Sequence, residues 1–573
     1  MRWPALNVIS QHRQVTDRFL GYNHHLRTAD GEFYNMGNLT SDQFPLLATR
    51  DRRGLVRETE GATAMVAKEE LCYVQGSTLV LGEQILDLGL TPGEKQLVSM
   101  GAFLVIFPDK VYVNTADLTD FGPLEQHTVT AGEVHLTMTR LEGDPLEITH
   151  RGTEAPAEPT SGTLWLDTEE GVLKQWSSSM ECWITFAATY VRISAPGIGL
   201  GFAPYDGITL EGLPAEAGVE TSAVIQAVGE DYITVPGLLP DEMTVTDPIT
   251  LRRSVPEMDF VIECRNRLWG CRSGPDGLGN TVNMLYASKL GDFRNWNCFQ
   301  GVSTDSYYVN LGSDGPFTGA SGALGVPLFF KENCLHRVYG DIPAEFALQD
   351  MPCRGLQAGC HRSLALVNEQ LIYKSRHAIC AYDGSLPVEI SAPLGEERYA
   401  AAVAGALGSK YYISMEDSRG ENHLFVLDAA WGLWHREDDL RVVDFAALNG
   451  ELYGLDTQGR ILAMGGSGEP AEKAVEWFAE TGILATDLPG QKFISRLTVR
   501  MSMAAGGRAR FFLRYDSLGG WIHAGTVNVT SLRSFSLPIR PRRCDHLQLR
   551  IEGIGEARIY SLTKVLEEGG EVL

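Results

Sequence analysis

The amino-acid sequence predicts an all-β protein: a β-propeller of about seven blades with an inserted small β-domain and a C-terminal β-sandwich. Glycine accounts for 61 of the 573 residues, an excess that indicates many tight turns between short strands. In the second half of the chain, pairs of short apolar strands recur about every 40 residues, which is the spacing of propeller blades. No segment has the periodicity of a long amphipathic helix or a coiled coil.

Residues 1–61 differ from the rest of the chain, because they combine turn-forming residues with few alternating hydrophobic residues. We expect an extended N-terminal arm that packs over a larger body. Within it, Arg50, Arg52 and Arg53 form a local basic cluster. This cluster is compatible with a solvated loop, and also with contacts in which the three arginines pair with acidic patches on neighbouring subunits.

The propeller is expected in two parts, with blades 1 and 2 in residues 62–124 and blades 3 to 7 in residues 255–465. Each predicted blade combines a short apolar strand, a turn and a second apolar strand. Six or eight blades also fit the spacing, because ring closure can use a strand from the N-terminal arm. The strands that carry the repeat in the second part are Arg267-Leu-Trp-Gly270, Pro327-Leu-Phe-Phe330, Gln370-Leu-Ile-Tyr373, Lys410-Tyr-Tyr-Ile413 and Glu451-Leu-Tyr-Gly454.

Between these two parts, residues 125–254 are expected to hold a linker and the inserted β-domain. Residues 143–162 are rich in Glu, Pro and Thr, which is typical of a mobile link, and residues 163–254 return to alternating strands. Toward the end of the chain, Arg and Ser alternate with Leu, Phe and Ile in longer strands, a pattern of half-buried strands. Residues 474–573 are therefore predicted to form a separate β-sandwich.

Composition narrows the function classes. The chain carries 48 Lys and Arg against 73 Asp and Glu, a formal net charge of −25, and such a surface argues against tight, sequence-independent binding to nucleic acid. The longest apolar run, Ala102–Phe107, is far shorter than the ~20 residues of a membrane span, so no membrane insertion is expected. The first residues, Met1-Arg-Trp-Pro4, lack the apolar region of a secretory signal, and we expect synthesis in the cytoplasm.

Motifs that carry chemistry point away from catalysis. The sequence has no P-loop, no Gly-x-Ser-x-Gly elbow and no His-Glu-x-x-His pair. Imperfect echoes of sialidase-type turns at Ser313–Phe317 and Asp516–Trp521 are better explained as ordinary turns. None of the 10 cysteines forms a Cys-x-x-Cys pair, so buried free thiols are expected instead of a disulfide framework or a zinc site. We therefore expect no catalytic residue, no metal and no cofactor, in a protein that is not an enzyme.

The most unusual stretch runs from Leu285 to Asn297 and contains Asp292, Phe293, Arg294 and Trp296. One interpretation is a recognition loop, since aromatic side chains beside Asp and Arg make good contact surfaces. The other, which we favour, is a long blade connection in which Asp292 caps a turn while Phe293 and Trp296 anchor it to the core.

This stretch, followed by Ser303-Thr-Asp-Ser306, resembles propeller proteins encoded among the virion structural genes of tailed bacteriophages and prophages. The similarity extends to Gly312–Gly315, Leu328–Lys331, Asn38–Asp42 and Arg540–Asp545. More distantly, the plan is similar to the propeller-bearing tail hub, or nozzle, that plugs packaged DNA in short-tailed phages. The role of that family is structural, so the resemblance carries over no catalytic residue.

The resemblance implies a structural component of a phage virion, located in the tail or neck and made in the cytoplasm of the host bacterium. It would form a ring with its own copies, contact neighbouring neck or tail proteins, and enclose double-stranded DNA in transit without reading its sequence. An acidic lumen would deny the DNA phosphates binding partners. The arm at 1–61 and the inserted domain are the expected subunit contacts.

Two other functions compete with this expectation. In a receptor-binding tail protein, the C-terminal sandwich would bind host glycans by stacking Tyr515 and Trp521 on sugar rings, although strand-end core is the favoured interpretation of these two residues. In a propeller glycoside hydrolase, two carboxylates roughly 5–9.5 Å apart would cleave host surface glycans.

Overall fold

The computed structural model describes residues 11–141, 143–186, 188–275, 281–484, 491–540 and 542–568. Strands dominate these ranges, and the helices found there are the four short 3-10 helices η1 (Ala215–Ala217), η2 (Pro343–Glu345), η3 (His361–Ser363) and η4 (Ala392–Leu394). Over the same residues, no helix has the length and apolar character needed to cross a membrane.

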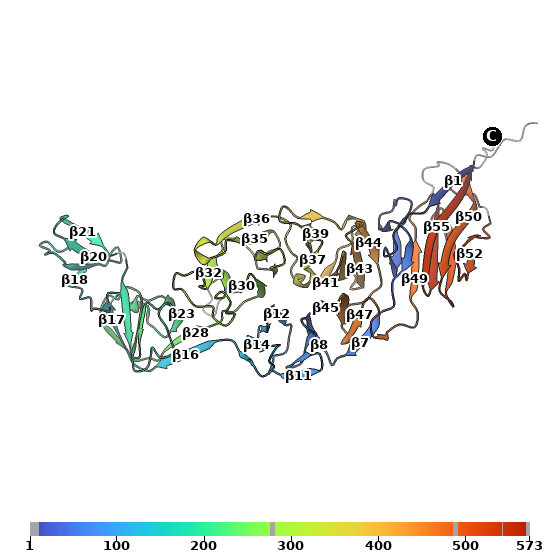
Figure 1. Ribbon diagram of the computed structural model, residues 1–573. Coiled ribbons are helices and arrows are strands. Elements are labelled where there is room, and N and C mark those ends of the chain that lie inside the picture. Colours follow the sequence, from blue (N-terminus) through green and yellow to red (C-terminus); the bar gives the residue numbers. More distant parts are fainter. Residues whose placement is uncertain are drawn as a thin grey trace, which may run out of the picture. The chain divides into compact units, whose positions relative to one another are not determined.

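Many strands belong to four-stranded sheets in which neighbours in the chain are also neighbours in the sheet (Figure 1). Outside the insertion between β15 and β29, six sheets follow the chain order in this way. Their strands are β8 (Ala62–Ala67), β9 (Leu71–Gln75), β10 (Thr78–Leu81) and β11 (Gln84–Asp87); β12 (Gln96–Met100), β13 (Phe103–Phe107), β14 (Val111–Asn114) and β15 (Phe121–Pro123); β29 (Phe260–Cys264), β30 (Arg267–Pro275), β31 (Thr281–Ala287) and β32 (Tyr307–Asn310); β33 (Gly319–Ser321), β34 (Leu328–Phe330), β35 (Cys334–Tyr339) and β36 (Ala347–Pro352); β37 (Ala365–Val367), β38 (Gln370–Lys374), β39 (Ile379–Tyr382) and β40 (Val388–Glu389); and β41 (Ala400–Leu407), β42 (Lys410–Glu416), β43 (Asn422–Asp428) and β44 (Leu433–Arg436).

The N-terminal segment supplies strands to sheets built from the end of the chain. Strand β7 (Gly54–Glu58) is the fourth strand of a sheet with the order β45-β46-β47-β7-β48. Strand β1 (Gln11–Thr16) pairs with β55, and β4 (Asn35–Gly37) pairs with β49. The N-terminal segment, predicted to pack as an arm over the surface, therefore forms strands inside these sheets. The other strands introduced here are β2 (Gly21–Tyr22), β3 (Glu32–Phe33), β5 (Leu39–Thr40), β6 (Leu47–Thr49), β45 (Val442–Leu448), β46 (Glu451–Asp456), β47 (Arg460–Ala463) and β48 (Glu469–Pro470).

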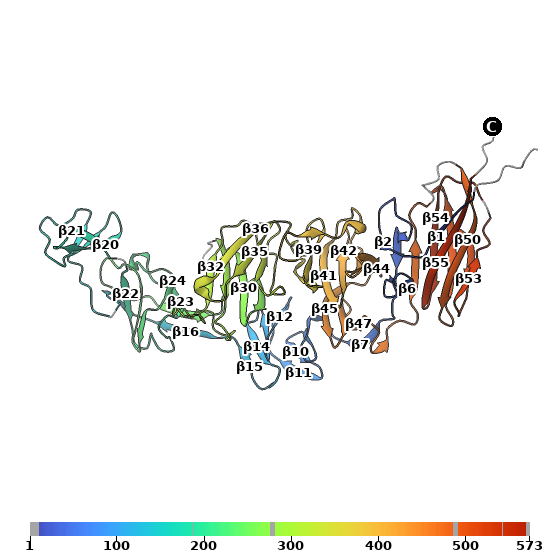
Figure 2. The ribbon, with the colours of Figure 1, turned by 45° about the horizontal axis from the view of Figure 1, so that its top comes forward.

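Two sheets with long strands lie near the C-terminus (Figure 2). One has the order β5-β6-β55-β50-β53 with β1 on β55, and the other has the order β4-β49-β54-β51-β52. Along β51, Ala509, Phe511 and Leu513 are buried while Arg508 and Arg510 are exposed, so the strand has one core face and one solvent face. Buried side chains of both sheets belong to one hydrophobic cluster. The strands are β49 (Glu476–Glu480), β50 (Lys492–Met503), β51 (Arg508–Tyr515), β52 (Ile522–Val527), β53 (Arg533–Ser536), β54 (Leu547–Ile554) and β55 (Ala557–Glu568).

The insertion between β15 and β29 is all-β and has its own hydrophobic core, which includes Leu136, Ile193, Ile233 and Leu251. Its three sheets have the orders β16-β28-β23-β24, β25-β26-β22-β17-β27 and β18-β19-β20-β21. The strands are β16 (Gln126–Ala131), β17 (Val134–Thr139), β18 (His150–Gly152), β19 (Leu164–Asp167), β20 (Val172–Ser177), β21 (Cys182–Thr185), β22 (Tyr190–Ser194), β23 (Gly207–Glu211), β24 (Ser222–Val224), β25 (Ala227–Gly229), β26 (Tyr232–Pro236), β27 (Met243–Val245) and β28 (Ile249–Ser254).

The chain divides into two compact units. The first consists of Met1–Leu97, Phe317–His336 and Asp350–Leu573, and the second of Val98–Pro316 and Arg337–Gln349. Inside the first unit, sheets pack on each other through shared apolar clusters, as strands β8–β10 of a four-stranded sheet do with β45–β47 of the five-stranded sheet. An all-β, propeller-like fold is confirmed, and all ten cysteines are free, with Cys182 the only exposed one.

Candidate functional site

The three arginines predicted as subunit contacts separate into two buried residues and one exposed residue. Arg53 is 4% exposed and pairs with Glu437 at 2.7 Å and Asp438 at 2.6 Å. Arg50 is 6% exposed and grips the two carboxylate oxygens of Glu472 at 2.8 and 2.9 Å. Both guanidinium groups are thus neutralised within their own chain, which corrects the expectation that they pair with a neighbouring subunit.

Arg52 is exposed and makes no ion pair with any residue in the described ranges. Its guanidinium donates only a long hydrogen bond of 3.4 Å to the carbonyl of Lys473. Of the three arginines, Arg52 alone retains a side chain that a neighbouring subunit could reach.

The buried arginines set the protonation state of their partners. Burial raises the pKa of Asp438, but the neighbouring Arg53 outweighs this and holds it below the ordinary value. Burial also raises the pKa of Glu472, but the hydrogen bond from Arg50 outweighs burial, and the pKa lies below its ordinary value. These carboxylates are charged at neutral pH, and the network fastens the N-terminal segment to residues near 437 and 472.

The stretch around Asp292 forms part of the core of the second unit. Phe293 and Trp296 are 5% and 4% exposed and belong to its apolar cluster. The Asp292 carboxylate accepts the N–H of Arg294 at 3.1 Å, and the Arg294 guanidinium lies 4.1 Å from the ring centre of Tyr112. A capped turn anchored by two aromatic side chains therefore accounts for these four residues, and the recognition-loop interpretation is not supported by their burial.

The two aromatic residues considered for glycan stacking are covered at least partly by other parts of the chain. Tyr515 is 6% exposed. The guanidinium of Arg514 lies 4.7 Å from the ring centre of Trp521. The burial of Tyr515 agrees with the favoured interpretation as strand-end core and not with the alternative of glycan stacking, whereas Trp521 is partly accessible.

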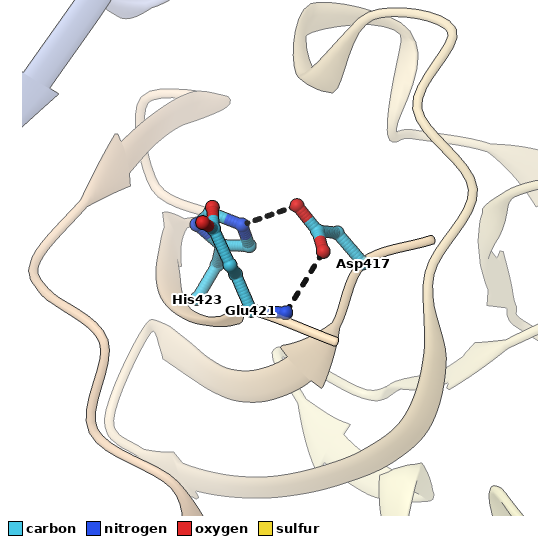
Figure 3. A group of neighbouring side chains, drawn as sticks. All are labelled: Asp417, Glu421 and His423. Atoms are coloured by element: carbon cyan, nitrogen blue, oxygen red, sulfur yellow. Dashed lines mark hydrogen bonds and ion pairs between the residues drawn. The ribbon is translucent and has the colours of Figure 1, made fainter. Parts of the chain in front are cut away.

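A second cluster, missed by the sequence analysis, brings Asp417, Glu421 and His423 together in the turn between β42 and β43 (Figure 3). A carboxylate oxygen or imidazole nitrogen of each lies within 4.8 Å of the others, which is the spacing of metal ligands. However, His423 Nε2 lies 3.2 Å from Asp417, and its Nδ1 accepts a 3.2 Å hydrogen bond from Arg436. Both imidazole nitrogens are thus engaged, and neither offers a free lone pair to a cation.

The same turn recurs without a histidine, which explains the cluster as backbone structure. Asp417 Oδ1 accepts the N–H groups of Arg419 and Glu421, both at 2.9 Å. In the turn between β46 and β47, Asp456 Oδ1 accepts the N–H groups two and four residues later, at 2.9 and 2.8 Å. In both turns the fourth residue is a glycine at positive φ, Gly420 and Gly459. The repeated Asp-x-x-Gly pattern could have identified these turns from the sequence.

A thiol, an imidazole and a carboxylate form a chain on β35 and β36. Cys334 Sγ lies 3.5 Å from His336 Nε2, and His336 Nδ1 lies 2.6 Å from Asp350 Oδ1. Residues two apart on a strand share a face, so the Cys-Leu-His spacing carries part of this arrangement, whereas nothing in the sequence ties Asp350 to it. Burial raises the pKa of Cys334 and lowers that of His336, so both are neutral at pH 7. The chain therefore acts as a hydrogen-bonded tie between the two strands.

A polar cleft of about 500 Å3 lies on the first unit, beside the sheet of β49, β54 and β51. Its walls include Arg508, Arg510 and Arg550, with Glu552 and Phe478. Glu552 accepts bonds from Arg510 at 2.9 Å and from Arg550 at 2.8 Å. Arg508 is exposed and makes no ion pair with a described residue. Arg436 also lines the cleft, as do four further carboxylates, Glu437, Asp438, Asp439 and Glu476. The unpaired positive charge is therefore confined to Arg508, a feature that the sequence analysis did not single out.

No protein-family model matches the sequence, and no curated protein is similar to it. Among solved structures, the chain is similar to an exo-β-1,3-galactanase from Phanerochaete chrysosporium, with 8% identity over 53% of this chain and 94% of that chain, at a TM-score of 0.22. It is similar to a GH43 glycoside hydrolase engineered in its active site, with 11% identity over 55% of this chain and 98% of that chain, at a TM-score of 0.20. The computationally designed Ika8 protein matches 72% of this chain over 99% of its own length, with 9% identity and a TM-score of 0.30.

These comparisons correct the expectation that the protein is not an enzyme, because the solved structures that it matches include glycoside hydrolases. The absence of the P-loop, Gly-x-Ser-x-Gly and His-Glu-x-x-His motifs is not enough to exclude an enzyme. At these TM-scores the similarity assigns no catalytic residue and no substrate to this chain.

Proposed function

We propose that the chain is a structural subunit of a tailed-phage virion that assembles with its own copies as a ring in the neck or tail. In this proposal the ring contacts neighbouring tail proteins and encloses the DNA conduit. Each subunit is a seven-bladed propeller with an inserted β-domain and a C-terminal β-sandwich.

The strand orders support this architecture. Outside the inserted domain, six four-stranded sheets follow the chain order, and β45-β46-β47 gains β7 as a further strand, which would close the ring of blades with the N-terminal segment. The two C-terminal sheets contribute to one apolar cluster, as the two layers of a sandwich do.

The observation that carries the function is the place of the residues that resemble phage propeller proteins. Phe293, Trp296, Asp305 and Ser306 are all buried. Asp305 accepts the N–H groups of Gly301 and Val302, at 2.6 and 3.1 Å. The resemblance to phage propeller proteins therefore rests on residues that determine the fold of the second unit. Similarity at such residues supports a shared architecture.

The charge fits a conduit as well. A net charge of −25 leaves DNA phosphates without binding partners over most of the surface, so that DNA in transit would not be retained. The inserted domain, with a core of its own, is free to serve as a contact element because the rest of the fold does not depend on it for apolar packing.

The test is mass photometry of the purified chain over a range of concentrations, with negative-stain imaging of the species found and immunogold labelling of intact virions. We expect closed rings with a central hole, and label at one fixed level of the neck or tail. A strict monomer at every concentration, or label that follows host-binding fibres, would reject the proposal and favour receptor recognition.

A further inference from the structure

The last part of the chain has the opposite charge to the whole. Residues 491–573 contain 13 Lys and Arg against 7 Asp and Glu, in a chain with a net charge of −25. Many of these arginines are exposed and make no ion pair with any described residue. They are Arg496, Arg500, Arg508, Arg533, Arg540, Arg542 and Arg543.

Part of this charge gathers on the outer face of the sheet β4-β49-β54-β51-β52, which we call the arginine face. It carries Arg508, Arg510 and Arg514 on β51 and Arg550 on β54. Arg514 is held by two hydrogen bonds to Gln548, at 2.8 and 2.6 Å. Glu480 and Glu552 form ion pairs with Arg510, Arg514 and Arg550, and the exposed Glu476 of β49 shares the face, so Arg508 is the arginine of this face without an ion pair to a described residue. The cleft of about 500 Å3 hollows this face beside Arg508.

The inserted domain shows the reverse pattern. Residues 125–254 contain 20 Asp and Glu against 6 Lys and Arg. The following carboxylates are exposed and make no ion pair with a described residue: Asp144, Glu147, Glu154, Glu158, Glu169, Glu181, Glu216, Glu220, Glu230, Asp231, Glu242 and Asp247.

One sheet of this domain, β18-β19-β20-β21, adds aromatic surface to the acidic charge, and we call it the tryptophan tip. Within the second unit, both views place it at the end away from β30 and β32 (Figures 1 and 2). Its inner face buries Leu164, Leu166 and Leu173 in the core of the domain. Its outer face carries Trp165, Trp176 and Trp183, with the last two half-exposed.

The tip has the surface of a contact element. Met180, in the turn that precedes Trp183, is 69% exposed, whereas Ile184, 45% exposed, lies on the opposite face of the strand from Trp183. Trp165 donates its indole N–H to the carbonyl of Gly152 at 2.9 Å, whereas the indole N–H groups of Trp176 and Trp183 have no acceptor among the described residues. An apolar centre with a charged rim is the usual anatomy of a protein interface.

We propose that the arginine face of one copy receives the tryptophan tip of the next copy. The contact would join the unpaired Arg508 to the unpaired carboxylates of the tip, and a guanidinium can also stack on a half-exposed indole. Two different surfaces on one chain make a head-to-tail contact, and such a contact closes into a ring when its rotation permits. The inference rests on the proposed function, because it names the interface by which the ring would form.

The experiment reverses charge on each surface of the full-length chain. One variant carries Glu169→Lys with Glu181→Lys on the tip, a second carries Arg508→Glu on the arginine face, and a third combines all three substitutions. The matched controls are Arg500→Glu, an exposed and unpaired arginine on β50 of the other sheet, and Glu230→Lys with Asp247→Lys, outside the tip. Assembly is measured by mass photometry at low and high NaCl.

We expect each reversal to weaken assembly by about 10-fold or more, the combined variant to recover it, and the controls to stay within about 2-fold of the wild type. High salt should dissociate the wild-type assembly, since it screens exposed charges. A combined variant that assembles no better than its parents, or controls that fail equally, would overturn the interface while wild-type rings leave the proposed function standing. A wild type that is monomeric throughout would overturn both. If Arg508→Glu instead abolishes binding of a short DNA duplex and leaves assembly intact, the occupant of the arginine face is a polyanion and the inference is wrong.

Discussion

The charged residues of the sheet β41–β44 and those of the C-terminal strands β50–β55 lie in opposite environments. Strand β43 is buried over five successive residues, Leu424 to Asp428, so both of its faces are covered. Strand β51 alternates between buried apolar residues and exposed or half-exposed arginines. Packing of one four-stranded sheet on the next covers the first region on two sides, whereas a two-layered arrangement leaves each C-terminal sheet with a solvent face.

This difference decides what the charges can do. Around β41–β44, Asp417, Asp428 and Asp438 are enclosed and have partners within the chain: Asp428, for example, accepts the Ser41 hydroxyl at 2.7 Å. A charge enclosed in this way must be compensated internally, because burial without a partner is strongly unfavourable. The arginines of β50 and β51 lie on solvent faces, so they need no partner inside the chain and can contact other molecules.

The largest effect is expected where a buried pair is broken. Replacing Arg53 by Ala removes the guanidinium nearest to the carboxylates of Glu437 and Asp438 and leaves them only the longer contacts with Arg50, at 3.6 and 3.4 Å. We expect the free energy of unfolding to fall by about 3–5 kcal/mol. Urea denaturation at neutral pH measures this change. Arg53 is the largest influence that lowers the pKa of Asp438, so this pKa should rise in the variant, and the stability that the wild type loses at this carboxylate on acidification should become smaller.

Arg52→Ala and Arg508→Ala are the matched controls, since both side chains are exposed and free of ion pairs with described residues. Each should change the free energy of unfolding by less than about 0.5 kcal/mol. The contrast between the two regions would fail if Arg508→Ala proved as destabilising as Arg53→Ala.

A smaller effect is expected from pH through His435, a buried residue of β44. Burial, with Lys410 nearby, lowers its pKa to about 4. Between pH 6.5 and 4 the unfolded chain binds a proton at this histidine and the folded chain does not, so stability falls as the pH falls. The loss over the whole window is about 3 kcal/mol.

His435→Gln should flatten the slope of unfolding free energy against pH between pH 6.5 and 5, above the range in which most carboxylates titrate. The slope between pH 7 and 8 is the internal control, because the imidazole is neutral in both states there. An unchanged slope between pH 6.5 and 5 in the variant would show that His435 gains a proton in the folded protein as readily as in the unfolded one.

The sequence predicted features that depend on neighbouring residues better than features that depend on residues far apart in the chain. The alternation of Phe493 to Arg500 predicted half-buried strands, and β50 shows that alternation. The capped turn at Asp292 was also visible, because its residues are adjacent. The arginine cluster was misread as a candidate subunit contact, because the partner Glu437 of Arg53 lies 384 positions away and no local pattern points to it. The pairing of β1 with β55 is hidden for the same reason.

The smallest effect sharpens the comparison within the enclosed region, between the turns at Asp417 and Asp456. If both carboxylates serve the backbone, Asp417→Asn and Asp456→Asn should lower the Tm by similar amounts, because each loses charge-assisted bonds to the N–H groups two and four residues later. Added Zn2+, Mn2+ or Ca2+ should not raise the Tm of the wild type, since a ligand that binds only the folded state would stabilise it. A Tm that rises with one of these ions in the wild type and in Asp456→Asn, but not in Asp417→Asn, would make the Asp417, Glu421 and His423 cluster a metal site. The engagement of both nitrogens of His423 by Asp417 and Arg436 is the reason to expect the opposite result.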